Sequence, residues 1–111
     1  MPGIVPIGQS QYINVSPTGG NVTYGPNISN TFRFVNESST STMYVAVYND
    51  ATLAAAFAKP SAGNPVPGVV AVAPGWQECV SGNFGAQNTN TIYCCAASSG
   101  TFGALVTPVR D

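Results

Sequence analysis

Short segments with a strand-like pattern recur along the whole chain, and turns rich in glycine, proline or asparagine separate them. The segment TMYVAVYND, residues 42–50, is rich in β-branched and aromatic side chains, which favour strands. In TFRFVN, residues 31–36, Phe32 and Phe34 fall on one face and Arg33 on the opposite face. Strands are predicted at residues 11–16, 22–24, 31–36, 42–50, 68–73, 76–81, 91–97 and 101–107.

Seven or eight short strands with almost no helical pattern between them predict an all-β protein. The expected architecture is an antiparallel β-sandwich or jelly roll. One segment differs, because residues 51–59, ATLAAAFAK, are rich in alanine and follow Asp50, a suitable N-cap residue. We therefore expect one short helix in a loop between strands.

The chain of 111 residues has room for one hydrophobic core, so residues 11–111 are expected to form a single β-sandwich domain. Residues 1–10 are expected to form an extended N-terminal arm, because Pro2 and Pro6 disfavour both a helix and a central strand. A disordered terminus is the alternative. The arm is favoured because it carries three branched aliphatic side chains that are costly to expose to water, Ile4, Val5 and Ile7.

Charged residues are unusually rare in this sequence. They make up 6% of the chain, against about 25% in an ordinary soluble domain, and only three of them are cations. A nucleic-acid surface and a basic amphipathic membrane helix both need clustered cations, so neither is expected. A surface with little charge also lacks the repulsion that keeps crowded copies apart. Such a surface suits a protein that packs densely beside copies of itself.

Few groups in the chain could carry out catalysis. There is no histidine, the commonest general base and a common metal ligand. Each carboxylate is expected to be a solvated surface charge rather than a catalytic acid. We therefore expect no enzymatic activity, no cofactor and no metal site. The carboxylates are Glu37, Asp50, Glu78 and Asp111.

Three cysteines, Cys79, Cys94 and Cys95, are the remaining reactive groups. Without histidine they are too few to complete the four-ligand shell of a structural zinc site. A Cys94–Cys95 disulfide would be strained, because adjacent Cα atoms lie about 3.8 Å apart, below the usual disulfide range. Neighbouring strand residues point to opposite faces, so one of the pair is expected inside and the other outside.

We expect Cys94 in the core and Cys95 on the outer face of its sheet. Cys79 alternates with polar residues and is also expected to face outward. Because an odd number of cysteines cannot all pair within one chain, an intersubunit disulfide through Cys79 or Cys95 is an alternative to reduced thiols. A nucleophilic cysteine is least favoured, since no base is available to activate it.

Trp76 stands at the start of an expected strand, directly after the turn residues APG. Its simplest role is packing in the core or between the sheets, because tryptophan side chains are usually buried. The alternative is an exposed aromatic platform for a sugar or for the surface of a partner. Tyrosines that could extend such a platform are Tyr12, Tyr24, Tyr44, Tyr48 and Tyr93.

The N-terminal residues carry no basic segment and no apolar stretch of signal-peptide length, so export is not expected. No run of 18 apolar residues is present, so no membrane span is expected either. The Asn-x-Ser/Thr triplets are therefore interpreted as products of composition rather than as glycosylation sites. These triplets begin at Asn14, Asn21, Asn27 and Asn36.

The second half of the chain combines a strand FRFVN that ends in asparagine, a YVAV strand, a PGWQE turn, an AASSG turn and a final VTPV. Over about residues 31–109 this combination resembles small all-β virion proteins of tailed bacteriophages, particularly head decoration (cement) proteins. The cysteines are not part of that pattern.

The resemblance implies a structural virion protein that binds the outer surface of a phage capsid as an oligomer and stabilises the shell. Its partners would be the major capsid protein and copies of itself, as a dimer or trimer, and it would be made in the cytoplasm of the host bacterium. The alternatives are a tail- or neck-associated virion protein and a carbohydrate- or receptor-binding β-sandwich, and only the latter would bind a glycan. The residues expected to make contacts are Ile4, Val5, Ile7 and Trp76.

Overall fold

The computed structural model describes residues 5–25, 28–57, 68–82 and 91–110. Within these residues the chain forms nine strands and one short helix, α1 (Ala51–Phe57). The strands are β1 (Val5–Pro6), β2 (Gln11–Val15), β3 (Gly20–Tyr24), β4 (Thr31–Asn36), β5 (Met43–Tyr48), β6 (Val70–Val72), β7 (Gln77–Ser81), β8 (Ile92–Ser98) and β9 (Phe102–Arg110). Each of the eight segments predicted as strands overlaps one of β2 to β9, although β3 begins two residues earlier than predicted and β8 and β9 end later.

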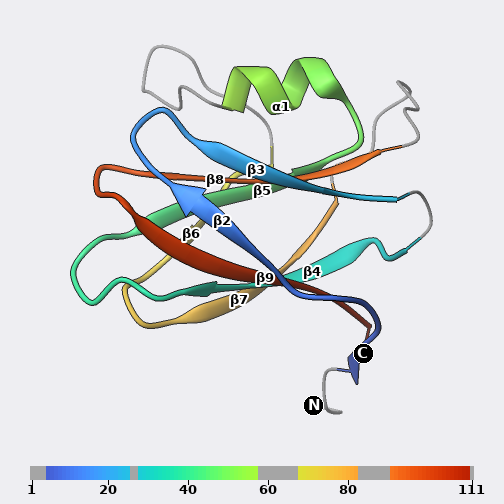
Figure 1. The fold of residues 1–111 in the computed structure, drawn as a ribbon, viewed down its shortest axis with the longest axis horizontal. Helices are drawn as coiled ribbons and strands as arrows, with labels where there is room; N and C mark the ends of the chain where they lie inside the picture. The colour runs from blue at the N-terminus through green and yellow to red at the C-terminus, as the bar shows by residue number, and fades with distance from the viewer. Residues whose placement is uncertain (1–4, 26–27, 58–67, 83–90, 111) are drawn as a thin grey trace.

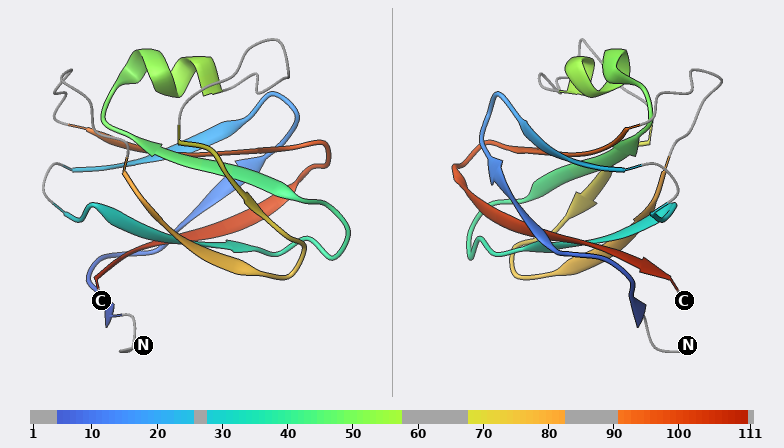
Figure 2. Two further views of the ribbon diagram at one scale, coloured as in Figure 1. Left: turned by 180° about the vertical axis from the view of Figure 1, so that it is seen from behind. Right: turned by 45° about the vertical axis from the view of Figure 1, so that its right-hand side comes forward.

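The strands form two antiparallel sheets that face each other (Figure 1 and Figure 2). Sheet A has the order β1-β9-β4-β7, and β2 also pairs with β9, so that β1 and β2 lie end to end along one edge. Sheet B has the order β3-β8-β5-β6. The prediction of an all-β antiparallel sandwich is confirmed at this level.

The interruption between β1 and β2 lies opposite Pro108 of β9. The Ile7 backbone N–H donates to the Pro108 carbonyl at 3.0 Å, and proline has no N–H to offer on the same side. A Cβ atom at Gly8 would lie 2.9 Å from Cγ of Pro108, so glycine lets the chain pass close to the ring. The predicted strand ended at residue 107, before this proline. In the structure β9 continues to Arg110. The proline is tolerated within β9 because the neighbouring edge strand is interrupted at the position where Pro108 lacks an N–H donor.

Inward-facing side chains of both sheets fill the space between them. On β4 the side chains of Phe32 and Phe34 are fully buried and Arg33 faces outward, as the alternation predicted. Cys94 of β8 is also in this core, which confirms its predicted position. The buried residues of this core are Ile13, Val15, Phe32, Phe34, Met43, Val45, Val47, Val72, Val80, Ile92, Cys94, Ala96, Ala104 and Val106.

Helix α1 lies over the outer face of sheet B (Figure 1). Asp50 caps it as predicted, because its Oδ1 accepts a hydrogen bond from the Thr52 N–H at 2.8 Å. The predicted helix continued to residue 59, and residues 58 and 59 lie outside the described residues. The helix gives this face a second, smaller core, made of Ala46, Tyr48, Ala54, Phe57, Cys95 and Ala97.

Asn36, at the end of β4, is fully buried and ties three segments together. Its Nδ2 donates to the carbonyl of Ser41 at 2.9 Å and to the carbonyl of Val72 at 3.0 Å. Its Oδ1 accepts from the Ser38 N–H at 2.9 Å. The amide therefore satisfies partly buried backbone groups of the β4–β5 loop and the buried carbonyl of Val72 in β6.

Candidate interaction faces

The outer face of sheet A is a regular surface of paired strands that helix α1 does not cover. Helix α1 lies on the opposite side of the molecule, over sheet B (Figure 2). One row of paired residues crosses four of the five strands of sheet A, namely β2, β9, β4 and β7. The row consists of Tyr12, Leu105, Val35 and Gln77. Their neighbours in sequence Ile13, Phe34, Ala104 and Val106 are in the core, so Tyr12, Val35 and Leu105 face outward.

The next row of the same face runs through Thr107, Arg33 and Cys79. Thr107 is buried, and its Oγ1 lies 2.7 Å from Oγ of Ser10, which belongs to the segment between β1 and β2. Arg33 is half-buried and Cys79 is exposed. We use the name sheet A face for these two rows, which consist of Tyr12, Leu105, Val35, Gln77, Thr107, Arg33 and Cys79.

Arg33 is the only charged residue of the sheet A face. Its Nε atom is buried and has no hydrogen-bond partner among the described residues. Glu78, on the neighbouring strand, alternates to the other face of the sheet together with its pair partner Phe34. Glu37 lies four residues further along, a distance of about 13 Å in an extended chain. The guanidinium group thus lies on this face without an adjacent carboxylate of its own sheet.

Trp76 is 67% exposed, so the prediction that it packs in the core or between the sheets is wrong. It precedes β7 and follows Gly75, whose φ of 75° places the chain in a left-handed turn. The Trp76 carbonyl accepts a hydrogen bond from the Asn36 N–H at 2.9 Å, which holds the backbone at the end of β4. The side chain is therefore exposed, as the alternative of an aromatic platform requires.

Residues 5–7 of the expected arm lie along sheet A. Ile4 is outside the described residues, and the side chain of Val5 is likewise outside them. The backbone of Val5 pairs with Arg110 in β1, and Ile7 follows with 37% of its side chain exposed. From residue 5 onward the arm therefore adds to an edge of its own sheet.

The three cysteines form no disulfide with one another. Cys95 does lie on the outer face of sheet B, as predicted, but α1 covers it and leaves it 1% exposed. The expectation that Cys95 offers an accessible thiol for an intersubunit bond is therefore corrected. Burial raises the pKa of the Cys95 thiol to about 12. Burial and, to a lesser extent, the neighbouring Cys95 raise the pKa of Cys94 far above its ordinary value.

We expect a thiol reagent to modify only Cys79 in the native protein. Cys94 and Cys95 are buried and stay protonated at neutral pH, and the thiolate is the nucleophilic form. Mass spectrometry after brief treatment with iodoacetamide at pH 8 should show one adduct. The same treatment in about 6 M guanidinium chloride, which unfolds most domains, should show three adducts. Three adducts on the folded chain would contradict the position of α1 over Cys95.

We also expect the free energy of unfolding to fall as the pH rises from 9 to 12. The pKa of Cys95 is raised from 9.0 in the unfolded chain to about 12 in the folded chain, so the folded state binds more protons. Its contribution is complete below pH 9 and is lost as the pH passes through the folded value. Urea denaturation at stepped pH should show a shallower decline for Cys95→Ala than for Cys79→Ala.

Tyr48 contributes to the same decline, because burial raises its pKa to about 12. Replacing Cys95 should therefore reduce the pH dependence rather than remove it. Identical declines in the two cysteine variants would show that Cys95 does not titrate differently in the folded and unfolded states.

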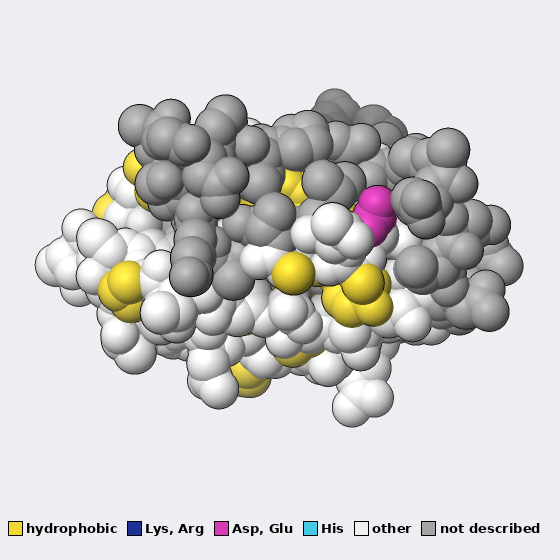
Figure 3. Space-filling view, turned by 90° about the horizontal axis from the view of Figure 1, so that it is seen from above, with side chains coloured by type: hydrophobic (Ala, Val, Ile, Leu, Met, Phe, Trp, Pro, Cys, Tyr) yellow, Lys and Arg dark blue, Asp and Glu magenta, His cyan; other side chains and the backbone are white. Residues whose placement is uncertain are grey.

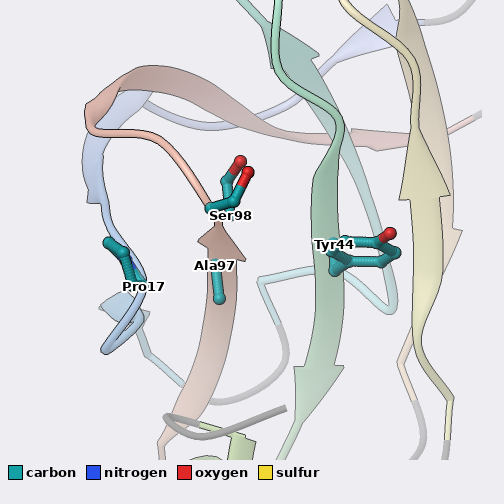
Figure 4. Close-up of a pocket in the computed structure, with 5 residues that line it drawn as sticks. Pro17, Tyr44, Ala97 and Ser98 are labelled. Atoms are coloured by element: carbon teal, nitrogen blue, oxygen red, sulfur yellow. The ribbon is translucent and has the colours of Figure 1, made fainter. Parts of the chain in front are cut away.

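A shallow depression lies on sheet B at the end of β8 (Figure 4). It is lined by Pro17, Tyr44, Ala97, Ser98 and Ser99. Its volume of about 270 Å³ is below the range of about 300 to 1,000 Å³ typical of small-molecule pockets. The Ser98 hydroxyl donates to the Thr42 carbonyl at 2.6 Å, so this donor is already used within the fold. In the view from above, the hydrophobic side chains of the described residues appear in small separate groups (Figure 3).

The described residues contain no group of three or more potential metal ligands of the His, Cys, Asp or Glu type. None of the helices described has the length and apolar character required to cross a membrane. Comparisons with protein-family models, with curated proteins and with solved structures find no match.

Sequence reasoning did not select Leu105 or Arg33 as candidate contact residues, and it named Tyr12 only as a possible extension of an aromatic platform around Trp76. Tyr12 is 63% exposed and stands in the same row as Leu105. The alternation in residues 31–36 placed Arg33 on the outer face correctly. Its position in the middle of sheet A depends on β4 lying between β9 and β7, an order that no local pattern contains.

Proposed function

We propose that this protein is a structural virion component that binds the outer surface of a bacteriophage capsid as an oligomer and stabilises the shell. The observation that carries the proposal is the nested pairing of β2 with β9, β3 with β8, β4 with β7, and β5 with β6. This order supports a jelly roll, in which one long antiparallel hairpin is rolled into two sheets. Viral capsid and lectin domains are common users of that fold.

The surface chemistry is consistent with a structural role, a point that the fold alone does not establish. The chain carries seven charged residues, and its polarity comes mainly from serine, threonine and asparagine. The buried thiols remain protonated at neutral pH. Exposed aromatic residues, Tyr12 and Trp76, supply the kind of rigid contact area that protein interfaces use.

Oligomerisation would allow weak contacts to act together. When copies are linked, the second contact with a lattice becomes intramolecular, and the overall affinity rises by about 10²- to 10⁴-fold without new chemistry. A dimer or trimer with closed symmetry would match symmetry axes of a capsid. Cys79 is the one exposed cysteine and therefore the position at which a disulfide between copies would form.

The proposal is tested by purifying phage particles from a lysate in which this chain is expressed from its phage genome. Antibody labelling and electron microscopy should place the chain on the head surface, and quantitative mass spectrometry should find it in many copies per particle. Non-reducing electrophoresis of the same particles reports whether Cys79 links copies. Absence of the chain from gradient-purified particles would overturn the proposal.

A glycan-binding module is the second candidate, and the exposure of Trp76 favours it. Tyr44 is 42% exposed and borders the depression on sheet B, where Ser98 and Pro17 project nearby (Figure 4). A glycan array probed with the wild type and with Trp76→Ala would support this candidate if a defined glycan bound only the wild type.

A further inference from the structure

Arg33 occupies an unusual position for one of only three cations in the chain. It lies on the central strand β4 of sheet A, between Thr107 of β9 and Cys79 of β7. Neither Cα partner is charged. The buried Nε–H has no acceptor among the described residues, and leaving a buried donor without a partner lowers stability.

The residues around Arg33 resemble the composition of protein interfaces. Tyr12, Leu105 and Val35 form an accessible apolar row directly beside it, and Arg and Tyr are both over-represented among residues that dominate binding energy. The nearest acidic side chain in the sheet, Glu78, is on the other face. The counter-charge for Arg33 is therefore not supplied by the sheet itself.

We infer that the sheet A face is the surface with which this protein docks on a partner protein, and that Arg33 receives a carboxylate of an aspartate or glutamate of that partner. The inference rests on the proposed function, since it identifies the face that attaches to the lattice. An arginine guanidinium binds carboxylates through paired charge-assisted hydrogen bonds, which are stronger than neutral ones. Charge complementarity thus selects a protein surface with an acidic side chain as the occupant.

The size of the face agrees with docking that depends on several copies. Four strands about 4.8 Å apart and about five residues long span roughly 320 Å². A stable interface between two proteins buries about 800 Å² on each partner. One sheet A face therefore supports weak attachment, and an oligomer that presents several such faces supports stable attachment.

The first experiment measures cosedimentation with particles that lack the protein, produced from a phage in which its gene is deleted. Arg33→Gln should weaken binding at least about tenfold, the loss typical of a residue that dominates an interface. Arg110→Gln is the matched control, because Arg110 is the other described arginine and lies exposed at the end of β9, and it should bind within about twofold of wild type. Equal binding by wild type and Arg33→Gln would overturn the inference while leaving the proposed function intact.

The thermal stability of Arg33→Gln separates binding from folding. Because the substitution removes a half-buried charge with an unsatisfied donor, the melting temperature should stay the same or rise. A variant that lost both binding and stability would indicate a purely structural Arg33 and would contradict the inference.

A second experiment does not depend on particles. The two described arginines should give separate Nε–Hε signals in a ¹⁵N-edited NMR spectrum, and the protein is titrated with N-acetyl-aspartate methylamide. The Arg33 signal should shift more than the Arg110 signal, and the neutral N-acetyl-asparagine methylamide should leave both unchanged. Equal shifts of both arginines would refute the carboxylate site. A selective shift together with failure of the wild type to bind particles would refute the proposed function alone.

Discussion

Replacing Asn36 with alanine is expected to lower the free energy of unfolding by about 4 kcal/mol, because it leaves one buried and two partly buried backbone groups without partners, and each buried group left unsatisfied costs about 1–3 kcal/mol. The lost bonds join the Asn36 amide to the carbonyls of Ser41 and Val72 and to the N–H of Ser38. Since the side chain is fully buried, water cannot replace these bonds without opening the fold. Chemical denaturation followed by circular dichroism measures the change.

The control for this prediction is Asn14→Ala, which truncates an exposed asparagine on β2. A surface change of this kind should alter stability by no more than about 0.5 kcal/mol. If the two alanine variants lost the same stability, the hydrogen bonds of Asn36 would not contribute more than an ordinary surface contact.

Replacing Gly20 with alanine is expected to destabilise the fold by about 3 kcal/mol, at the upper end of the cost of overpacking. Gly20 begins β3, where the chain passes from sheet A to sheet B, and an added Cβ atom would overlap the backbone carbonyl oxygen of Asn14. The obstructing atom belongs to the main chain of β2, so a change of side-chain rotamer cannot relieve the overlap. Thermal unfolding of the variant provides the measurement.

Gly25 offers a matched glycine for comparison. An added Cβ atom there would have no neighbour within 4 Å, so Gly25→Ala should change stability by less than about 1 kcal/mol in either direction. A loss in Gly25→Ala as large as in Gly20→Ala would mean that chain entropy, and not the contact with Asn14, determines the effect.

The regular part of the fold could be predicted because strand patterns are local. The alternation in residues 31–36 placed Phe32 and Phe34 inside and Arg33 outside, and the structure agrees. The same alternation put Cys94 in the core and Cys95 on the opposite face. Each of these predictions needed only the two-residue repeat of an extended chain.

The candidate contacts were harder to predict because they depend on which elements are neighbours. Cys95 faces outward but is buried, since a helix from another part of the chain covers it. Trp76 was assigned to the core from the usual burial of its type, yet it precedes β7 and is exposed. The position of Arg33 in the middle of the sheet A face follows only from the strand order β9-β4-β7, which no local pattern in the sequence predicts.

The place of β9 in sheet A has a consequence for how the protein is made. The ribosome delivers β9 after every other described strand, yet β1, β2 and β4 all pair with it. Pairing between such distant segments is slow, because a long loop must close before any contact is gained. During translation sheet A therefore cannot form completely until β9, its central strand, has been synthesised. A nascent chain that stalls before residue 102 would expose the unpaired edges of β2 and β4 to other nascent chains on the polysome.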